Sequence, residues 1–511
     1  MMSAALSPIA VLLNAGNPNR ITAKYHFYET PSHLLGMGAQ LNEVGYDVRY
    51  IDPWGEGLRV RETIRRTLED KPRVVGITLF GGSPQLNNFG LTFLKGMPEE
   101  VRVVTGGPGI SQPFFRRIFL ANRRPPDFAV VGEGENPMDL LIGADFKHED
   151  LAIPDDGSVK ISRSGDTTTL INMQHSAMDA LGIERPREWG RYRYQTIDAQ
   201  RGCLYGGCSF CESTTVWGWS SYKFPEAFET ELSYLSRTFD SPGISFRGPD
   251  FSADPVASTA IIDTMNKAGV KGRKVLMYGR VDSLYQAVSS NRDIWREFTR
   301  NNKVTIIVGY ESGIPTRLMR LTKYHSRAIV DARQHLSRFA NILEMLPDLH
   351  VIVDWILMDG SSNLLEISLD LALMIGLLKK FPEQTLLNQD QVFNYFRSSP
   401  GASKRRAALG KFGNLDSDST IFLYQSTRDP KMRGMGSRRF GNLGNYRKFI
   451  IKTLEYALSK STILLCNPVK VVSREEALAN WSAVRARFSE MVKEVERGDD
   501  FLSLGLEGYP L

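Results

Sequence analysis

The chain lacks the features that would make it a disulfide-stabilised, fibrous or membrane-spanning protein. Only four of its 511 residues are cysteine, and three of these fall within nine positions, which is no disulfide framework. Its longest uninterrupted apolar runs, such as Leu371–Leu378, are far shorter than the roughly 20 residues that a membrane-spanning helix needs. The opening MMSAALSPIAVLLNAG has no basic segment ahead of its apolar run, and it predicts a strand rather than a signal peptide. We therefore expect a cytoplasmic protein with no membrane partner.

The charge of the chain is mild but unevenly spread. Its net charge is +6 at pH 7, with 42% hydrophobic and 23% charged residues, a composition typical of folded domains. Basic residues gather at Lys404–Arg406 and at Arg428–Arg439. A solvated surface accounts for these groups, and contact with phosphate or nucleic acid is the alternative. Because no recognisable RNA-binding module accompanies them, nucleic acid is disfavoured as a partner.

The first 143 residues predict a doubly wound parallel sheet of the α/β class, Rossmann-like or flavodoxin-like. Short β-branched runs alternate with stretches such as His33–Val44 and Val60–Leu68, which are long enough for crossover helices. Glycine-rich loops follow three of the runs, at the edge where open parallel sheets bind ligands. The candidate strands are Ile9–Asn14, Asp47–Asp52, Val74–Leu79, Val101–Thr105 and Asp127–Val131.

Three further regions follow. Residues 144–194 are polar and rich in Gly, Pro and Asp, and they predict a linker with one small hairpin. Residues 195–400 alternate strands and helices again, which suits a partial (β/α)6 barrel whose active site lies at the strand C-termini. Residues 401–511 predict a mainly helical docking region, with a capping box at Ser473 and Glu476. The barrel strands are expected to end near Gln200, Phe246, Tyr278, Tyr310, Leu357 and Phe396.

Three cysteines in a glycine-rich loop directly after a strand carry the strongest chemical signal. Cys203, Cys208 and Cys211 are suited to a soft metal centre. A structural zinc site is the first rival, but it would want a fourth Cys or His ligand, and no histidine lies in this loop. A three-cysteine iron–sulfur cluster leaves one iron open to an outside ligand. The fourth cysteine, Cys466, is predicted to be a buried, inert thiol.

This loop resembles the signature of radical S-adenosylmethionine (SAM) enzymes, including an aromatic residue, Phe210, just before the last cysteine. The usual spacing in that family is three residues and then two. Here the first gap holds four residues, and Gly206 and Gly207 can absorb the extra one as a bulge. The resemblance implies that Cys203, Cys208 and Cys211 hold a 4Fe-4S cluster that cleaves SAM.

Further barrel segments resemble the SAM-binding strand ends of the same family. Asp250 resembles the carboxylate near the SAM amino group, and Gly309–Gly313 resembles the family's Gly-x-Glu-Ser-Gly. The resemblance implies cofactor contacts, or substrate contacts, for Arg280, Glu311 and Ser312. Tyr310 and Glu311 are the candidate catalytic residues; the alternative for each is an ordinary polar residue at the barrel rim.

The first region resembles the cobalamin-binding domain that precedes the barrel in one radical SAM subfamily, and a plain flavodoxin-like domain is the alternative. The likeness rests on Val103–Pro108 and Phe128–Glu135. No Asp-x-His-x-x-Gly loop is present, so we expect no histidine ligand to cobalt. The candidate cobalamin-binding residues are Gly81, Ser83, Gly106, Gly107, Gly132 and Glu133.

Together these resemblances imply a cobalamin-dependent radical SAM enzyme, similar to the class B methyltransferases. The leading hypothesis is a C-methyltransferase that acts on an unactivated carbon of a small molecule, with ferredoxin or flavodoxin as electron donor. The alternatives are a cobalamin-dependent cyclase or ring-rearranging enzyme, a cobalamin-free radical SAM enzyme, and an RNA-modifying enzyme. A cobalamin or cluster sensor is the non-enzymatic alternative.

Overall fold

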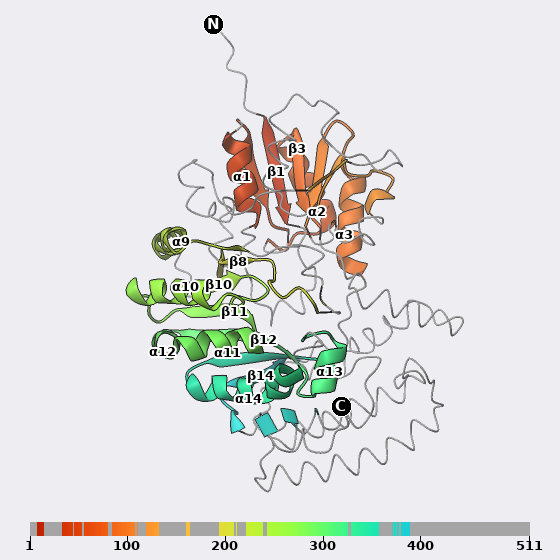
Figure 1. Ribbon diagram of the computed structural model, residues 1–511. Helices are drawn as coiled ribbons and strands as arrows, with labels where there is room; N and C mark the ends of the chain where they lie inside the picture. The colour runs from red at the N-terminus through yellow and green to blue at the C-terminus, as the bar shows by residue number, and fades with distance from the viewer. Residues whose placement is uncertain are drawn as a thin grey trace, which may run out of the picture. The chain divides into compact units, whose positions relative to one another are not determined.

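Two parallel β-sheets, each with helices beside it, form the described part of the chain in a computed structural model (Figure 1). No helix within these residues is both long and apolar enough to cross a lipid bilayer. The described residues are 8–14, 33–43, 45–53, 56–79, 84–107, 110, 119–131, 160–163, 194–208, 211, 221–238, 243–324, 329–356, 370, 373–374, 376–377 and 380–388.

The first sheet contains six parallel strands in the order β2-β1-β3-β4-β5-β6. The order of the first five strands, β2-β1-β3-β4-β5, is that of flavodoxin-like sheets. In such sheets the order in which strands are added reverses between β1 and β3, and a ligand crevice forms there at the strand C-termini. Its strands are β1 (Ile9–Asn14), β2 (Asp47–Ile51), β3 (Val74–Thr78), β4 (Arg102–Gly106), β5 (Phe128–Val131) and β6 (Lys160–Arg163).

Both faces of this sheet are covered, which explains its near-continuous apolar strands. Alternate residues of β1 belong to two different hydrophobic cores. Leu12 lies in one core with Leu34 of α1 (His33–Glu43), and Val11 lies in the other core with Phe93. The helices α2 (Val60–Glu69) and α3 (Pro84–Lys95) contribute to this second core. The doubly wound α/β architecture predicted from the sequence is confirmed for these residues.

One element of the predicted linker belongs to this sheet. The sequence predicts a linker with one small hairpin within 144–194, and the structure describes 160–163 and 194 of this range. Lys160–Arg163 forms strand β6, which pairs in parallel with β5, and the hairpin remains a prediction. A short run such as Lys-Ile-Ser-Arg carries no signal of its partner, and the exposed edge of β5 supplies that partner from outside the run.

The second sheet has the order β14-β13-β12-β11-β10-β7, so its strands follow one another in chain order. The pairs β7/β10, β10/β11, β12/β13 and β13/β14 are parallel. The strands are β7 (Gln195–Asp198), β10 (Gly243–Arg247), β11 (Lys274–Arg280), β12 (Lys303–Glu311), β13 (His350–Trp355) and β14 (Thr385–Asn388). The connecting helices are α9 (Pro225–Thr238), α10 (Pro255–Lys267), α11 (Val281–Ser290), α12 (Arg292–Asn301), α13 (Pro315–Arg320) and α14 (Ile329–Met345).

The sixth barrel strand is described in part. The sequence predicts a strand that ends near Phe396, and β14 (Thr385–Asn388) pairs in parallel with β13, with Asp354 opposite Asn388. Residues 389–396 lie outside the described residues, so the predicted end of this strand remains a prediction.

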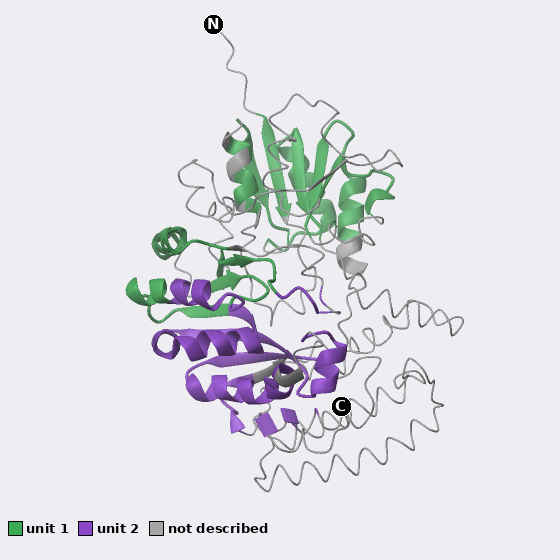
Figure 2. Ribbon diagram, in the orientation of Figure 1, with its two compact units in different colours: residues 1–204, 212–251, 263–276 green, residues 205–211, 252–262, 277–511 purple. Residues whose placement is uncertain are grey.

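The chain divides into two compact units whose boundary runs through β11 (Figure 2). Unit 1 comprises residues 1–204, 212–251 and 263–276, and unit 2 comprises residues 205–211, 252–262 and 277–511. The domain boundaries predicted from the sequence remain predictions.

Candidate functional site

The cysteine loop begins at a two-stranded antiparallel ribbon formed by β8 (Gln200–Arg201) and β9 (Ser221–Tyr222). Gly202 and Gly206 have φ angles of 74° and 57°, in the left-handed region that glycine occupies without strain. Cys203, Cys208 and Cys211 are half-buried and free of disulfides. No group of three or more His, Cys, Asp or Glu side chains among the described residues is arranged to hold a metal ion.

Cys208 and Cys211 lie against apolar side chains. Both pack on the buried residues Leu321 and Ile356, and the backbone N–H of Cys211 donates to the carbonyl oxygen of Cys208 at 3.2 Å. Burial raises the pKa of the Cys208 thiol to about 12, against the opposing influence of the Lys323 and Arg280 charges. Without a cation this thiol is therefore protonated at neutral pH, and it would release its proton on binding a metal.

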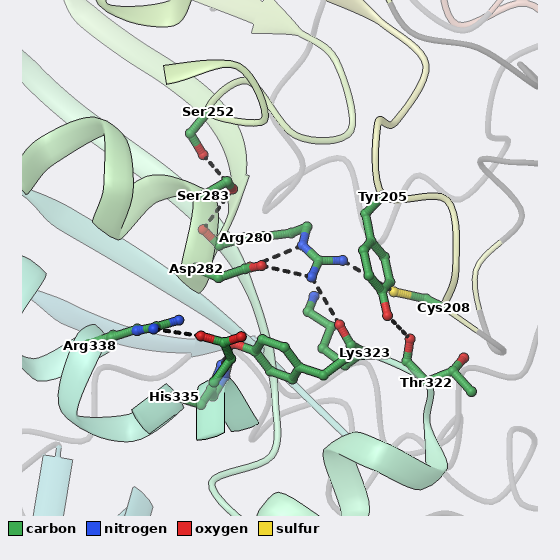
Figure 3. A network of polar contacts seen from close by, with 12 residues as sticks. Tyr205, Cys208, Ser252, Arg280, Asp282, Ser283, Thr322, Lys323, His335 and Arg338 are labelled. Carbon is green, nitrogen blue, oxygen red and sulfur yellow. Dashed lines mark hydrogen bonds and ion pairs between the residues drawn. The ribbon is translucent and has the colours of Figure 1, made fainter. Parts of the chain in front are cut away.

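Arg280, at the end of β11, contacts this loop directly (Figure 3). Its Nη1 lies 3.8 Å from the Sγ of Cys208, and its Cζ lies 3.7 Å from the ring centroid of Tyr205. Nε and Nη2 donate to the two carboxylate oxygens of Asp282 at 3.1 Å each, and Nη2 donates to the carbonyl of Lys323 at 2.9 Å. The sequence resemblance implies a SAM or substrate contact for Arg280; the structure directs its guanidinium to a cysteine sulfur.

The turn after α13 is hydrogen-bonded to the cysteine loop. Thr322, with a φ angle of 49°, donates from Oγ1 to the carbonyl of Gly207 at 2.5 Å. Tyr205 donates from its hydroxyl to the carbonyl of Thr322, also at 2.5 Å. Asp282, Thr322 and Lys323 were not found from the sequence. Thr322 lies 115 positions from Gly207, and no motif marks such a partner.

Glu311 and Ser312 occupy a sharp turn at the end of β12. Glu311 has a φ angle of 57°, which is strained for a residue with a side chain. Its carboxylate pairs with Lys323 at 2.9 Å, and both side chains are buried. Ser312 donates from Oγ to Asp370 at 2.6 Å, so its hydroxyl supports the turn. The structure therefore brings Cys208, Arg280 and Glu311 together around Lys323.

Tyr310 points away from this cluster of contacts. Its fully buried ring packs against His335 and Phe339, both on α14. On β12, Val308 and Tyr310 alternate with the more exposed Gly309, which places the Tyr310 ring on the helix-covered face of the strand. The catalytic role of Tyr310 remains a prediction, and this packing offers it no support.

His335 is expected to make the chain sensitive to acid. It is completely buried, with Nδ1 2.7 Å from the Tyr324 hydroxyl and Nε2 3.0 Å from the Tyr310 carbonyl oxygen. Burial, followed by the Lys323 charge, lowers the pKa of His335 from 6.5 to about 3. The folded state therefore binds fewer protons than the unfolded state below pH 6.5, and stability falls as the pH falls through this window.

The expected loss is about 1.4 kcal/mol per pH unit, or about 2 kcal/mol between pH 6.5 and 5. Urea unfolding at several pH values, with the opening of α14 in unit 2 monitored by hydrogen exchange, measures this loss of stability. His335→Gln should flatten this slope, whereas His350→Gln, at a more exposed histidine, should leave it unchanged. Equal slopes in the native chain and His335→Gln would contradict the assignment.

Asp250 lies in unit 1, just after β10. It is buried, and its backbone N–H donates to Oε1 of Gln200 at 3.4 Å. Gly248 makes this approach possible, because a Cβ there would lie 2.7 Å from the Gln200 carbonyl oxygen. Tyr222 donates from its hydroxyl to the Asp250 carbonyl at 3.3 Å, so the ribbon and the β10 end are joined.

Buried charges support the strand that precedes the loop. Asp198 pairs with Arg201 at 2.8 Å, and both side chains are buried. Burial alone would raise the pKa of Asp198, but Arg201, Arg247 and Lys223 together hold it well below its usual range. Burial lowers the pKa of Lys223 to about 8, although Glu231 and Asp198 oppose this shift. These residues were not singled out from the sequence, where charged residues beside a strand look like a solvated surface.

The glycines at the edge of the first sheet are described only in part. Gly106 ends β4 and accepts a hydrogen bond from the Leu79 N–H at 2.9 Å. Gly107 has a φ angle of 87°, and a Cβ there would lie 2.6 Å from Cγ2 of Thr78 and 3.0 Å from the Leu79 carbonyl oxygen. The other predicted residues at this edge, Gly81, Ser83, Gly132 and Glu133, lie outside the described residues.

Comparison with known proteins finds likeness in structure but not in sequence. No family model matches the chain, and no curated protein matches it. The fold is similar to that of OxsB, described as a cobalamin-dependent S-adenosylmethionine radical enzyme. With aqua-cobalamin bound, OxsB matches at a TM-score of 0.62 and 14% identity, over 98% of this chain and 83% of that chain. With aqua-cobalamin and S-adenosylmethionine bound, it matches at 0.63 and 14%, over 98% and 85%. The apo, selenomethionine-labelled form matches at 0.60 and 14%, over 98% and 83%.

Proposed function

We propose that this chain is a cobalamin-dependent radical SAM enzyme, and that it methylates an unactivated carbon of a small molecule. The observation that carries the proposal is a Cys203-x4-Cys208-x2-Cys211 loop at a strand end, in a chain that shares its fold with OxsB over 98% of its length. Three thiolates suit a cluster with one open iron. In this proposal, the cofactors supply a carbon radical and a methyl group, and the chain supplies position and the exclusion of water.

Contacts within unit 2 support the roles that we propose for its residues. Cys208 and Cys211 would hold two irons, with Leu321 and Ile356 excluding water from their sulfurs. Glu311 is the proposed SAM contact at the end of β12, where Lys323 fixes its carboxylate. We propose that the Ser312 hydroxyl acts indirectly, since it is engaged with Asp370.

In unit 1, Cys203 would hold the third iron and Asp250 would meet the SAM amino group. The buried position of Asp250 supports this role, because a carboxylate removed from water binds an ammonium group strongly. We propose that cobalamin binds at the C-terminal edge of the first sheet, where Gly106 ends β4 and Gly107 follows it with a φ angle of 87°. We further propose a small-molecule substrate and a ferredoxin-like or flavodoxin-like electron donor.

Anaerobic reconstitution tests the proposal. The chain is loaded with iron, sulfide and hydroxocobalamin, and its absorption spectrum, cobalamin content and conversion of SAM to 5′-deoxyadenosine are measured. We expect one cobalamin and one cluster per chain, with 5′-deoxyadenosine formed under reducing conditions. Methyl-labelled SAM and candidate substrates then separate methyl transfer from ring formation or rearrangement. A chain that forms the cluster without binding cobalamin would be a cobalamin-free radical enzyme, and a chain that forms no cluster would refute the proposal.

Gly107 provides a matched test of the cobalamin assignment. Gly107→Ala places a Cβ against Thr78 and Leu79 at the ligand edge, and we expect cobalamin affinity to fall by about tenfold or more. Gly45→Ala is the control, because Gly45 has a similar φ angle of 92° but nothing within 4 Å of its Cβ position. Equilibrium dialysis against hydroxocobalamin measures both. Equal affinities in the two variants would place cobalamin elsewhere.

A further inference from the structure

Arg280 brings a positive charge to the sulfur of Cys208. It is 5% exposed, its Nη1 lies 3.8 Å from Sγ, and its Cζ lies 3.7 Å from the centroid of the Tyr205 ring (Figure 3). An arginine stays protonated at every pH a protein tolerates. Because the group is buried, its field acts through a medium of low dielectric constant and is stronger than at a surface.

The partners of Arg280 orient this charge. Asp282 binds Nε and Nη2, and the Lys323 carbonyl binds Nη2 again, which leaves Nη1 as the nitrogen that faces the sulfur. The positive end of the Arg280–Asp282 pair is therefore directed at Cys208. The Tyr205 ring is a further partner of the guanidinium, and the Tyr205 hydroxyl donates in turn to the Thr322 carbonyl.

A second cation, Lys323, lies near Cys208. Each of the two cations is paired with a carboxylate, Lys323 with Glu311 at 2.9 Å and Arg280 with Asp282 at 3.1 Å. The Lys323 charge lowers the pKa of the Cys208 thiol more than the Arg280 charge does. Among the described residues, Arg280 is the cation with a direct contact to the Cys208 sulfur. Its removal is therefore the change that alters the charge at this sulfur most simply.

We propose that Arg280 is a positioning residue that raises the reduction potential of the iron–sulfur cluster held by Cys208. This inference rests on the proposed function. When the cluster accepts one electron from a low-potential donor, its charge becomes one unit more negative, and no bond forms or breaks in that step. A fixed cation beside a ligand sulfur stabilises the reduced form, as hydrogen bonds to cluster sulfurs do. Arg280 thereby eases the electron transfer that must precede SAM cleavage.

Redox titration of the reconstituted chain tests this role. The cluster is titrated with dithionite in the absence of SAM, and the reduced form is quantified by electron paramagnetic resonance. Arg280→Gln should shift the midpoint to a more negative potential, and Arg280→Lys should give a smaller shift in the same direction. Asp282→Asn removes an anion, and it should shift the midpoint to a less negative potential. Arg338→Gln is the control: Arg338 pairs with Asp331, and its removal should leave the midpoint unchanged.

The outcomes separate this inference from the proposed function. If the native chain takes up no cluster, the proposed function fails, and the role of Arg280 falls with it. If the cluster forms and Arg280→Gln has the native midpoint, only the role of Arg280 is overturned. If Arg280→Gln takes up no cluster, opposite shifts in Arg280→Lys and Asp282→Asn support the role, and any other pair of results overturns it.

Discussion

Replacement of Cys208 by alanine is expected to abolish both the iron–sulfur absorption and the formation of 5′-deoxyadenosine. A 4Fe-4S cluster with one open iron needs all three protein thiolates. Alanine offers no ligand atom, and the Leu321 and Ile356 side chains that pack on this position are apolar. Metal binding free energies are large compared with the stability of a domain, so the loss of one ligand is expected to lower cluster content and turnover by about 100-fold or more.

Two controls define the meaning of that result. Cys466→Ala removes the fourth cysteine, which is predicted to be inert and lies outside the described residues; it should keep the cluster and the product. Circular dichroism and thermal melting of the apo chains show whether Cys208→Ala folds normally. If Cys208→Ala retained SAM cleavage, Cys208 would not be a ligand, and the three-cysteine assignment would fail.

The strands of the first sheet could be predicted because they are buried on both faces. The sequence predicts a strand at Ile9–Asn14, and β1 has the same bounds. The two stretches predicted to be long enough for crossover helices correspond to α1 (His33–Glu43) and α2 (Val60–Glu69). Continuous β-branched runs are the pattern that a covered parallel sheet requires, so composition and periodicity suffice there.

Strand β6 is an element that the sequence did not single out. Lys160–Arg163 pairs in parallel with β5, a partner that lies outside the run itself. Local pattern is a weak guide for a short edge strand, where pairing dominates.

The candidate site shows a similar division. The positions of Cys208, Arg280 and Glu311 at strand ends could be read from the sequence, because β-strand patterns and motifs mark them. Their contacts could not, since Arg280 lies 72 positions from Cys208 and 43 from Lys323. Lys323 is the clearest omission: it follows α13 in a segment without a motif, yet it contacts both Arg280 and Glu311.

A buried ion pair beneath the Glu311 turn leads to the second large prediction. Asp370 and Arg317 pair with each other, and neither side chain is exposed to solvent. Asp370 also accepts hydrogen bonds from the Ser312 hydroxyl and the Gly313 N–H, both at 2.6 Å. Burial raises the pKa of Asp370, while Arg317 and these donors oppose the shift. Arg317 in turn donates to the Ile356 carbonyl at 2.6 Å, which connects the pair to a residue that packs on Cys208.

Asp370→Asn is therefore expected to destabilise unit 2 by about 3–5 kcal/mol, because it leaves the Arg317 charge buried without its counter-ion. The double variant Arg317→Met/Asp370→Leu removes both charges and should lose less stability than the single one, since an apolar pair of similar volume carries no desolvation cost. Hydrogen exchange of β12 and α13 in the apo chain measures the effect locally, which avoids the assumption that the whole chain unfolds in one step. Arg338→Gln is the control for loss of a partly exposed pair, and about 0–1 kcal/mol is expected there. If Asp370→Asn proved as stable as the control, Asp370 would not be the anion that fixes the Ser312–Gly313 turn. Glu311 would then be held in its strained conformation by Lys323 instead.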